Sequence, residues 1–216
     1  MVFSKTAGFR HDSIPAGIDA VRALGERNRF HMDAGEDASA FTDENLSRYR
    51  VVVFLNTTGE VLDPDQRAAF ERFIRGGGGF VGIHAASDTG YQWPWYGGLV
   101  GTYFQRHPAI QPATLAVVDP SHVSTRHLPI SWKRTDEWYD FRHDLDSNIT
   151  VLIRIDESSY RGGRMGAHHP MAWYHQYDGG RAWYTALGHT IESYREPLML
   201  EHLAGGILWA AGFVRE

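Results

Sequence analysis

The stretch Gly76-Gly77-Gly78-Gly79-Phe80-Val81-Gly82-Ile83-His84-Ala85-Ala86 decides how this chain folds. Four glycines end one element, and a short run with large apolar side chains follows them, up to a histidine flanked by small residues. Such a run predicts a buried β-strand. In open parallel sheets, ligands bind in the crevice beyond the carboxyl ends of the strands. We therefore expect His84 to form the floor of a site.

The chain before this stretch alternates between strand and helix patterns. Residues 2–4 and 30–33 are predicted to be strands, and residues 51–55 are continuously apolar, as in a strand covered on both faces. A helix is predicted after Ser13, and a second begins at Asp63, where Pro64 and Gln66 complete a capping box. This alternation predicts an α/β fold with a doubly wound, mostly parallel sheet.

The second half of the chain has a different pattern. Alternating apolar residues from Ala113 to Val117 predict an antiparallel or edge strand, and residues 151–155 predict another. Residues 168–175 and 181–185 flank Asp178-Gly179-Gly180, which is the turn chemistry of a hairpin. A last helix begins at Pro197. Because no repeat, low-complexity tract or linker interrupts the pattern, residues 1–216 are predicted to form a single domain.

Composition excludes several classes of function. A formal charge of −5 and a pI near 6.2 argue against a nucleic-acid surface, and no apolar run approaches the roughly 18 residues that span a bilayer. The first residues resemble a strand rather than a signal peptide, which favours a cytoplasmic protein. The chain has no cysteine, so disulfides, thiolate metal sites and cysteine nucleophiles are excluded. Its 12 His, 7 Trp and 10 Tyr suit a histidine-lined metal site or a carbohydrate pocket.

Aromatic side chains are concentrated just after His84. Residues 91–96 contain four of them and are interrupted by a proline, so the segment is either the rim of a pocket or a lid packed on the sheet. Further along, Trp173 and Trp183 are expected to face the core from the hairpin. The aromatic residues expected to stack on a sugar are Trp93, Trp95, Trp138 and Tyr139.

Five segments together resemble the ThuA-like proteins, the trehalose-utilisation family with a class I glutamine-amidotransferase-like fold. They are Thr6-Ala7-Gly8-Phe9-Arg10-His11, residues 77–84, Asp136-Glu137-Trp138-Tyr139, His169-Pro170-Met171-Ala172-Trp173 and residues 179–189, and they follow one another over nearly the whole chain. Such proteins usually carry more apolar residues before the first serine, so the first strand is expected to be short.

The resemblance implies a flavodoxin-like sheet with an antiparallel extension, and a role in catabolism of trehalose-like disaccharides or their keto forms. In amidotransferases, the turn after the glycine-rich strand carries a cysteine nucleophile. Here that turn holds His84, and the chain has no cysteine, so thiol-dependent glutaminase chemistry is excluded whatever the fold.

Two chemical uses of the histidines compete. In one, His11, His84 and His107 hold a divalent metal such as zinc, together with Asp136 or Glu137. In the other no metal is needed: His84 and His189 act as acid and base with Glu137, and Arg181 stabilises negative charge. A third interpretation leaves the histidines as hydrogen-bond partners of buried backbone. Residues expected to bind substrate are Arg10, His11, Trp93, Asp136, Tyr139 and His169.

These observations favour an enzyme that hydrolyses or eliminates across a glycosidic or keto-sugar bond in a histidine-rich pocket. The alternative is a non-catalytic carbohydrate-binding or accessory subunit that acts with a sugar oxidoreductase, and an amidotransferase-like interaction domain is a third hypothesis. The expected partner is a small-molecule carbohydrate. Exposed aromatic side chains on this fold are compatible with a homodimer.

Overall fold

A nine-stranded sheet organises the computed structural model, which describes residues 1–214. Its strand order is β2-β1-β3-β4-β11-β10-β9-β6-β7, and β5 and β8 form a separate pair. The first five strands in that order are parallel and the others antiparallel. The strands are β1 Val2–Phe3, β2 Ala34–Gly35, β3 Val51–Leu55, β4 Gly79–Ile83, β5 Phe104–Arg106, β6 Gln111–Val117, β7 Ser131–Asp136, β8 Asp140–Phe141, β9 Thr150–Asp156, β10 Pro170–Tyr177 and β11 Gly180–Thr185.

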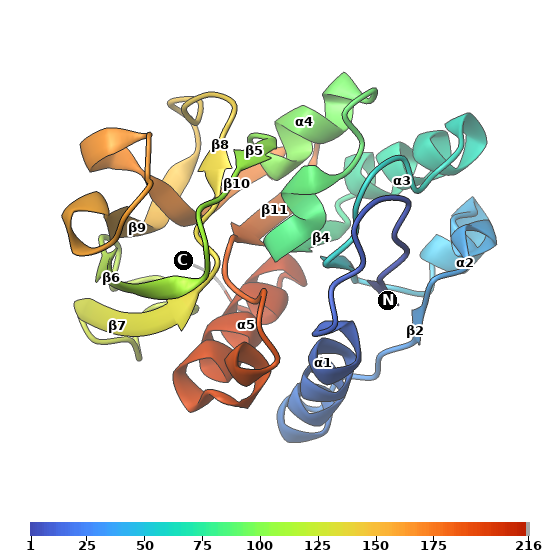
Figure 1. Cartoon of the computed structure of the whole chain (residues 1–216). Helices are drawn as coiled ribbons and strands as arrows, with labels where there is room; N and C mark the ends of the chain where they lie inside the picture. Colours follow the sequence, from blue (N-terminus) through green and yellow to red (C-terminus); the bar gives the residue numbers. More distant parts are fainter. Residues whose placement is uncertain (215–216) are drawn as a thin grey trace.

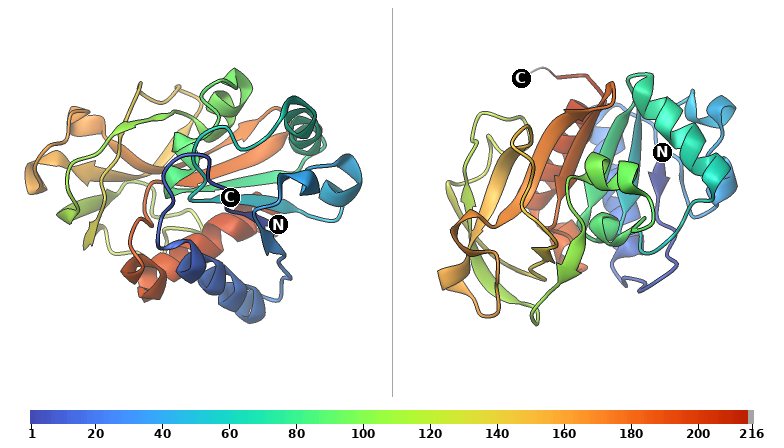
Figure 2. Two further views of the ribbon diagram at one scale, coloured as in Figure 1. Left: turned by 45° about the vertical axis from the view of Figure 1, so that its right-hand side comes forward. Right: turned by 90° about the horizontal axis from the view of Figure 1, so that it is seen from above.

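Helices cover both faces of the parallel part, so the predicted doubly wound α/β arrangement is confirmed (Figures 1 and 2). Helices α1 and α5 lie together on one face, and α3 and α4 lie on the other. The α-helices are α1 Ile14–Asn28, α2 Asp43–Leu46, α3 Pro64–Arg75, α4 Pro94–Val100 and α5 Pro197–Ala210; 3₁₀ turns occupy Ala38–Ala40, His84–Asp88, Glu157–Ser159, Gly166–His168 and Glu192–Arg195. No helix within residues 1–214 is long and apolar enough to cross a membrane.

The strands β3 and β4 form where the sequence predicts them, and every residue of both is buried. The capping box that begins α3 is also present, with Asp63 and Gln66 bonded reciprocally. The predicted hairpin is β10–β11, and it joins the two halves of the sheet because β11 is parallel to β4 and antiparallel to β10. Its Trp173 and Trp183 are fully buried, as expected.

The second predicted strand is displaced. Residues 30–33 are not a strand; β2 is the next two residues, Ala34 and Gly35, which pair with Val2 and Phe3. Phe30 instead closes the end of α1, where its N–H donates to the carbonyl of Gly25 at 3.0 Å. The apolar side chain of Phe30 therefore packs at the end of a helix and does not mark a strand.

The antiparallel half is fastened to the parallel half by Asp136. This residue ends β7, four strands away from β11 in the sheet order, yet its carboxylate accepts hydrogen bonds from the backbone N–H of Gly188 (2.9 Å) and of His189 (3.1 Å), in the loop after β11. The Ser193 hydroxyl donates to it at 3.2 Å, and the buried Arg134 guanidinium lies 3.3 Å away. Its negative charge is therefore buried but well satisfied.

Asp136→Asn should destabilise the fold strongly, because the amide replaces a paired, buried carboxylate and leaves the buried Arg134 with only the more exposed Glu196 as a charge partner. We expect a loss of about 3 kcal/mol in the free energy of unfolding, measured by urea denaturation. Asp19→Asn, which touches only an exposed ion pair with Arg22, should cost less than about 0.5 kcal/mol. Equal losses in the two variants would contradict the role given to Asp136.

His202 should make the fold sensitive to acid. Its ring is fully buried between the Ser124 carbonyl (2.7 Å) and the Thr185 hydroxyl (3.2 Å), and burial lowers its pKa from 6.5 to about 3. Because the folded pKa lies below the unfolded one, the stabilisation is present above pH 6.5 and is lost as the pH falls toward 3. In urea denaturation at about pH 6 to 4, His202→Gln should reduce the slope of stability against pH by about 1.4 kcal/mol per pH unit. An unchanged slope would contradict this assignment.

Candidate active site

His84 stands on a sharp turn directly after β4. Its φ is +48°, in the left-handed region that non-glycine residues rarely adopt and that is typical of strained functional positions. The turn is tight enough that a Cβ on Gly82 would lie 2.8 Å from the ring of Tyr184. The Tyr184 hydroxyl also donates to the carbonyl of His84 at 2.7 Å. Neighbouring small residues and this hydrogen bond hold the backbone that aims the imidazole into the crevice.

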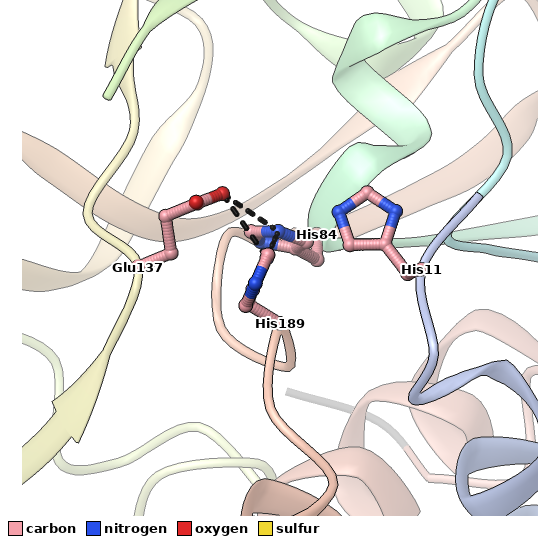
Figure 3. Close-up of side chains that lie close together, drawn as sticks. All are labelled: His11, His84, Glu137 and His189. Atoms are coloured by element: carbon pink, nitrogen blue, oxygen red, sulfur yellow. Dashed lines mark hydrogen bonds and ion pairs between the residues drawn. The ribbon is translucent and has the colours of Figure 1, made fainter. Parts of the chain in front are cut away.

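Three groups converge at the carboxyl edge of the sheet, as Figure 3 shows. His84 follows β4, His189 follows β11, and Glu137 follows β7. His84 Nε2 lies 3.1 Å from His189 Nδ1 and 3.5 Å from Glu137 Oε2, and His189 Nδ1 lies 3.1 Å from the same oxygen. Residues separated by more than 50 positions along the chain thus meet at one point.

His107 contacts the other oxygen of the same carboxylate. Its Nδ1 lies 2.9 Å from Glu137 Oε1 and 2.9 Å from the carbonyl of Pro108. Both neighbours are acceptors, so Nδ1 carries the proton and Nε2 keeps its lone pair. The side chain is 42% exposed, whereas His84 is fully buried and Glu137 is 7% exposed. His107 is therefore the member of the group that solvent and a large ligand reach.

His11 completes the group from the loop after β1. Its ring meets those of His84 and His189 edge to face, with centroids 4.9 and 5.0 Å apart. Donor atoms of His11, His84, Glu137 and His189 all lie within 4.8 Å of one another. His11 is 4% exposed, and its buried Nδ1 has no hydrogen-bond partner among the described residues. Phe9, which is 65% exposed, packs against the ring of His11.

The charges in this group depend on one another. Burial would raise the pKa of Glu137, but the neighbouring rings of His189 and His84 outweigh burial and hold it well below its ordinary value. Burial would lower the pKa of His189, and the hydrogen bond and charge of Glu137 outweigh burial and raise it. Burial, followed by the charges of His84 and His189, lowers the pKa of His11 to about 3. The site therefore contains a carboxylate, a His189 ring whose protonated form that carboxylate stabilises, and a His11 ring that burial keeps neutral.

Several predicted site residues do not join this group. Arg181 is the second residue of β11 and pairs with Gly79 at the opposite end of the sheet, so it cannot stabilise charge beside His84. Arg10 is exposed and bonded to Glu36 through both terminal nitrogens. Asp136 is buried beneath the loop of His189, where it positions that residue rather than contacting a ligand.

Three of the four predicted sugar platforms are buried and Trp95 is partly buried, because the segment after His84 is packed down as in the lid alternative. Trp93 is 6% exposed and donates to Glu71, Trp95 stacks on Trp93 beside α3, and Trp138 is fully buried. Tyr139 is 3% exposed and packs on the ring of His84 with centroids 4.2 Å apart. Tyr139 therefore orients the histidine and offers no free face to a sugar.

His169 belongs to a second cluster. Its Nδ1 lies 2.8 Å from Glu157 Oε1, and its Nε2 lies 2.7 Å from the carbonyl of Tyr139. Asp140 is also within reach of this ring. The sequence did not single out Phe9, although an exposed aromatic residue two positions before His11 was visible in the motif.

Comparisons with known proteins agree with the fold. The chain superposes on ThuA-like proteins from Bacteroides uniformis (23% identity, TM-score 0.81, 97% of this chain and 90% of that one) and Parabacteroides merdae (22%, 0.79, 97% and 89%). It also superposes on part of a β-galactosidase from Bacillus circulans (13%, 0.65, 97% of this chain and 31% of that one). No curated protein matches the sequence.

The sequence profile of the ThuA family, described as trehalose utilisation, matches residues 1–210. The five motifs of the sequence lie within that range, and the structural neighbours have the same fold. The chain therefore belongs to the ThuA family, which carries a carbohydrate-related role.

Proposed function

We propose that this protein is an enzyme of carbohydrate catabolism that cleaves the glycosidic bond of a keto-disaccharide, related to trehalose, at the group formed by His84, Glu137, His189 and His107. The observation that carries the proposal is the convergence of these four side chains at the carboxyl edge of the sheet, with His84 on a strained turn. Support for the substrate class comes from the family, whose description is trehalose utilisation.

His107 is the group placed to move a proton. The Glu137 carboxylate accepts from its Nδ1–H, as the carboxylate does in a catalytic triad, and this leaves Nε2 as the base. Among the described residues Nε2 has no hydrogen-bond partner, and the side chain is accessible. Rings of Phe104 and Tyr139 lie beside the imidazole and limit its motion.

His189 forms the electrophilic side of the site. Abstraction of the hydrogen on the carbon next to the ketone sends the C–H electron pair into a new C=C bond and the C=O pair onto oxygen, forming an enolate. We assign the stabilisation of that oxygen to His189, whose protonated form is favoured by the hydrogen bond and charge of Glu137. The enolate then re-forms the ketone and expels the glycosidic alkoxide, which takes the proton from His107. Water added across the resulting double bond completes a net hydrolysis.

Phe9 supplies the apolar surface that the buried tryptophans do not. It is 65% exposed and lies at the entrance beside His11, with ring centroids 4.9 Å apart. The C–H face of a sugar packs readily on an exposed aromatic ring. We therefore assign the substrate platform to Phe9 in place of Trp93.

His107→Gln should abolish proton abstraction while leaving the fold intact. With a keto-trehalose in D₂O, the wild-type protein should exchange the hydrogen next to the ketone and release the second sugar, both followed by NMR. The variant should be slower by about 10²- to 10⁴-fold, the contribution of a general base. His143→Gln, at an exposed histidine that bonds the Asp144 carbonyl, is the matched control and should behave as wild type.

Two outcomes would count against this proposal. Undiminished exchange in His107→Gln would remove the assigned base. Calorimetric binding of the sugar by the wild-type protein, with neither exchange nor cleavage, would favour the non-catalytic carbohydrate-binding or accessory subunit.

Phe9→Ala should raise KM for the keto-disaccharide several-fold and leave kcat nearly unchanged, because the ring binds substrate and transition state equally. Phe213→Ala is the control, since Phe213 is 63% exposed but lies near the opposite end of the sheet, beside Arg29 and Met32. A fall in kcat with KM unchanged would show that Phe9 acts on His11 rather than on the sugar.

A further inference from the structure

The tautomer of His84 is fixed by the backbone. Its Nδ1 lies 2.8 Å from the carbonyl of Ala186, which can only accept, so Nδ1 carries the hydrogen. The lone pair of Nε2 therefore points at Glu137 and His189. A lone pair aimed at a carboxylate 3.5 Å away is unfavourable unless a positive group lies between them. In the protein alone, the hydrogen on His189 Nδ1 is shared between two acceptors, His84 Nε2 and Glu137 Oε2.

The spacing of these three donor atoms fits a metal ion. The separations are 3.1, 3.1 and 3.5 Å. Ligands about 2.0–2.1 Å from a tetrahedral zinc ion lie about 3.3–3.4 Å apart. An ion can therefore occupy the centre of the triangle with shifts of a few tenths of an ångström. Two imidazoles and one carboxylate are also a donor set that divalent transition metals accept.

The atoms of His84 and Glu137 that face away from this triangle make the hydrogen bonds that are usual for metal ligands. Ligating histidines usually donate their second N–H to a carbonyl, and ligating carboxylates are themselves hydrogen-bonded. His84 donates to Ala186, and Glu137 accepts from His107 with the oxygen that faces away from the triangle. Tyr139 packs on the His84 ring and fixes its plane.

The second cluster shows what a structural histidine looks like in the same molecule. Both ring nitrogens of His169 face acceptors, the Tyr139 carbonyl and the Glu157 carboxylate. The Tyr160 hydroxyl lies a further 3.3 Å from the same Nδ1, so both ring nitrogens of His169 already have partners within the protein. A histidine–glutamate contact alone does not make a metal site, and the difference lies in where the second nitrogen points.

We propose that His84 Nε2, His189 Nδ1 and Glu137 Oε2 are the three protein ligands of one divalent transition-metal ion, with the remaining position open toward His11. Three protein ligands and an open position are the arrangement of catalytic zinc sites. His11 and His107, two of the three histidines that the sequence suggested as ligands, lie beside the ion and behind Glu137 respectively. The role of the ion rests on the function proposed above: it replaces the His189 proton as the group that polarises the ketone.

Metal content tests the site without any sugar. Protein stripped with EDTA and dialysed against Zn²⁺, Mn²⁺ or Co²⁺ should take up one ion per chain by elemental analysis and melt at a higher temperature. Bound Co²⁺ should show the intense visible absorption of a four-coordinate ion. Glu137→Gln and His189→Gln should weaken binding about 100-fold or more, whereas the loss of a supporting contact in His107→Gln should cost at most about 10- to 100-fold.

Glu157→Gln is the matched control, because it alters the same kind of carboxylate–histidine contact in a cluster whose histidine has protein partners at both ring nitrogens. Its ion content should equal that of the wild type. Circular dichroism of each variant separates loss of metal from loss of fold, and His189, on a loop with 19% of its side chain exposed, provides a variant that should fold.

The metal-site proposal is contradicted if no ion binds stoichiometrically, if ion binding survives both Glu137→Gln and His189→Gln, or if Glu157→Gln abolishes ion binding. An ion that binds as described in a protein without α-proton exchange supports the metal site and contradicts only the catalytic proposal. Full exchange by ion-free protein contradicts the catalytic role of the metal and leaves the acid–base proposal standing.

Discussion

The carboxylate of Asp136 holds together two backbone segments that are far apart in the sequence, the end of β7 and the loop after β11. Its Oδ1 accepts from the N–H of Glu137 at 3.0 Å and from that of His189 at 3.1 Å, so one buried oxygen fixes the starting points of both side chains. Arg134 and Ser193 complete its shell and offset the cost of burying the charge. The geometry of the site is therefore set by a residue that contacts no ligand, and the antiparallel extension has a function: it returns a carboxylate to the edge of the parallel sheet.

The elements that the sequence predicts correctly are those whose signal is local. Continuous apolar runs identify β3 and β4, and Asp178-Gly179 identifies the hairpin, because each pattern determines its own structure without reference to the rest of the chain. β2 was misplaced because its two residues are exposed and carry no apolar pattern. They form a strand only because β1 offers an edge to pair with. The pairing of β11 with β4 is likewise decided by the tertiary fold rather than by nearby residues.

The difference between local signals and tertiary packing also explains which site residues the sequence predicts. The sequence groups His84 and His189 because each follows a predicted strand, whereas Glu137 joins them only through a family motif, since β7 is not predicted. Arg181 lies near the start of its strand, and the polarity of a parallel sheet separates it from residues that follow the strand ends. Trp93 could not be excluded in this way. Its burial follows from the packing of α4 against Phe70 and neighbouring rings, which no local pattern reveals.

A histidine at the end of β4 changes what the fold can do. The likeness to a domain of β-galactosidase and to ThuA-like proteins at 13–23% identity shows that the scaffold is shared, and a scaffold does not specify a reaction. A thiol on the strained turn after this strand acts as a nucleophile only when nearby groups stabilise the thiolate. An imidazole there, with its Nδ1–H held by Ala186, presents a neutral lone pair that forms no lasting covalent bond to a sugar. What it can do is hold a proton or an ion at a fixed point. Glu137 and His189 lie within 3.5 Å of that lone pair, which is the geometry on which the proposed polarisation of a carbonyl depends.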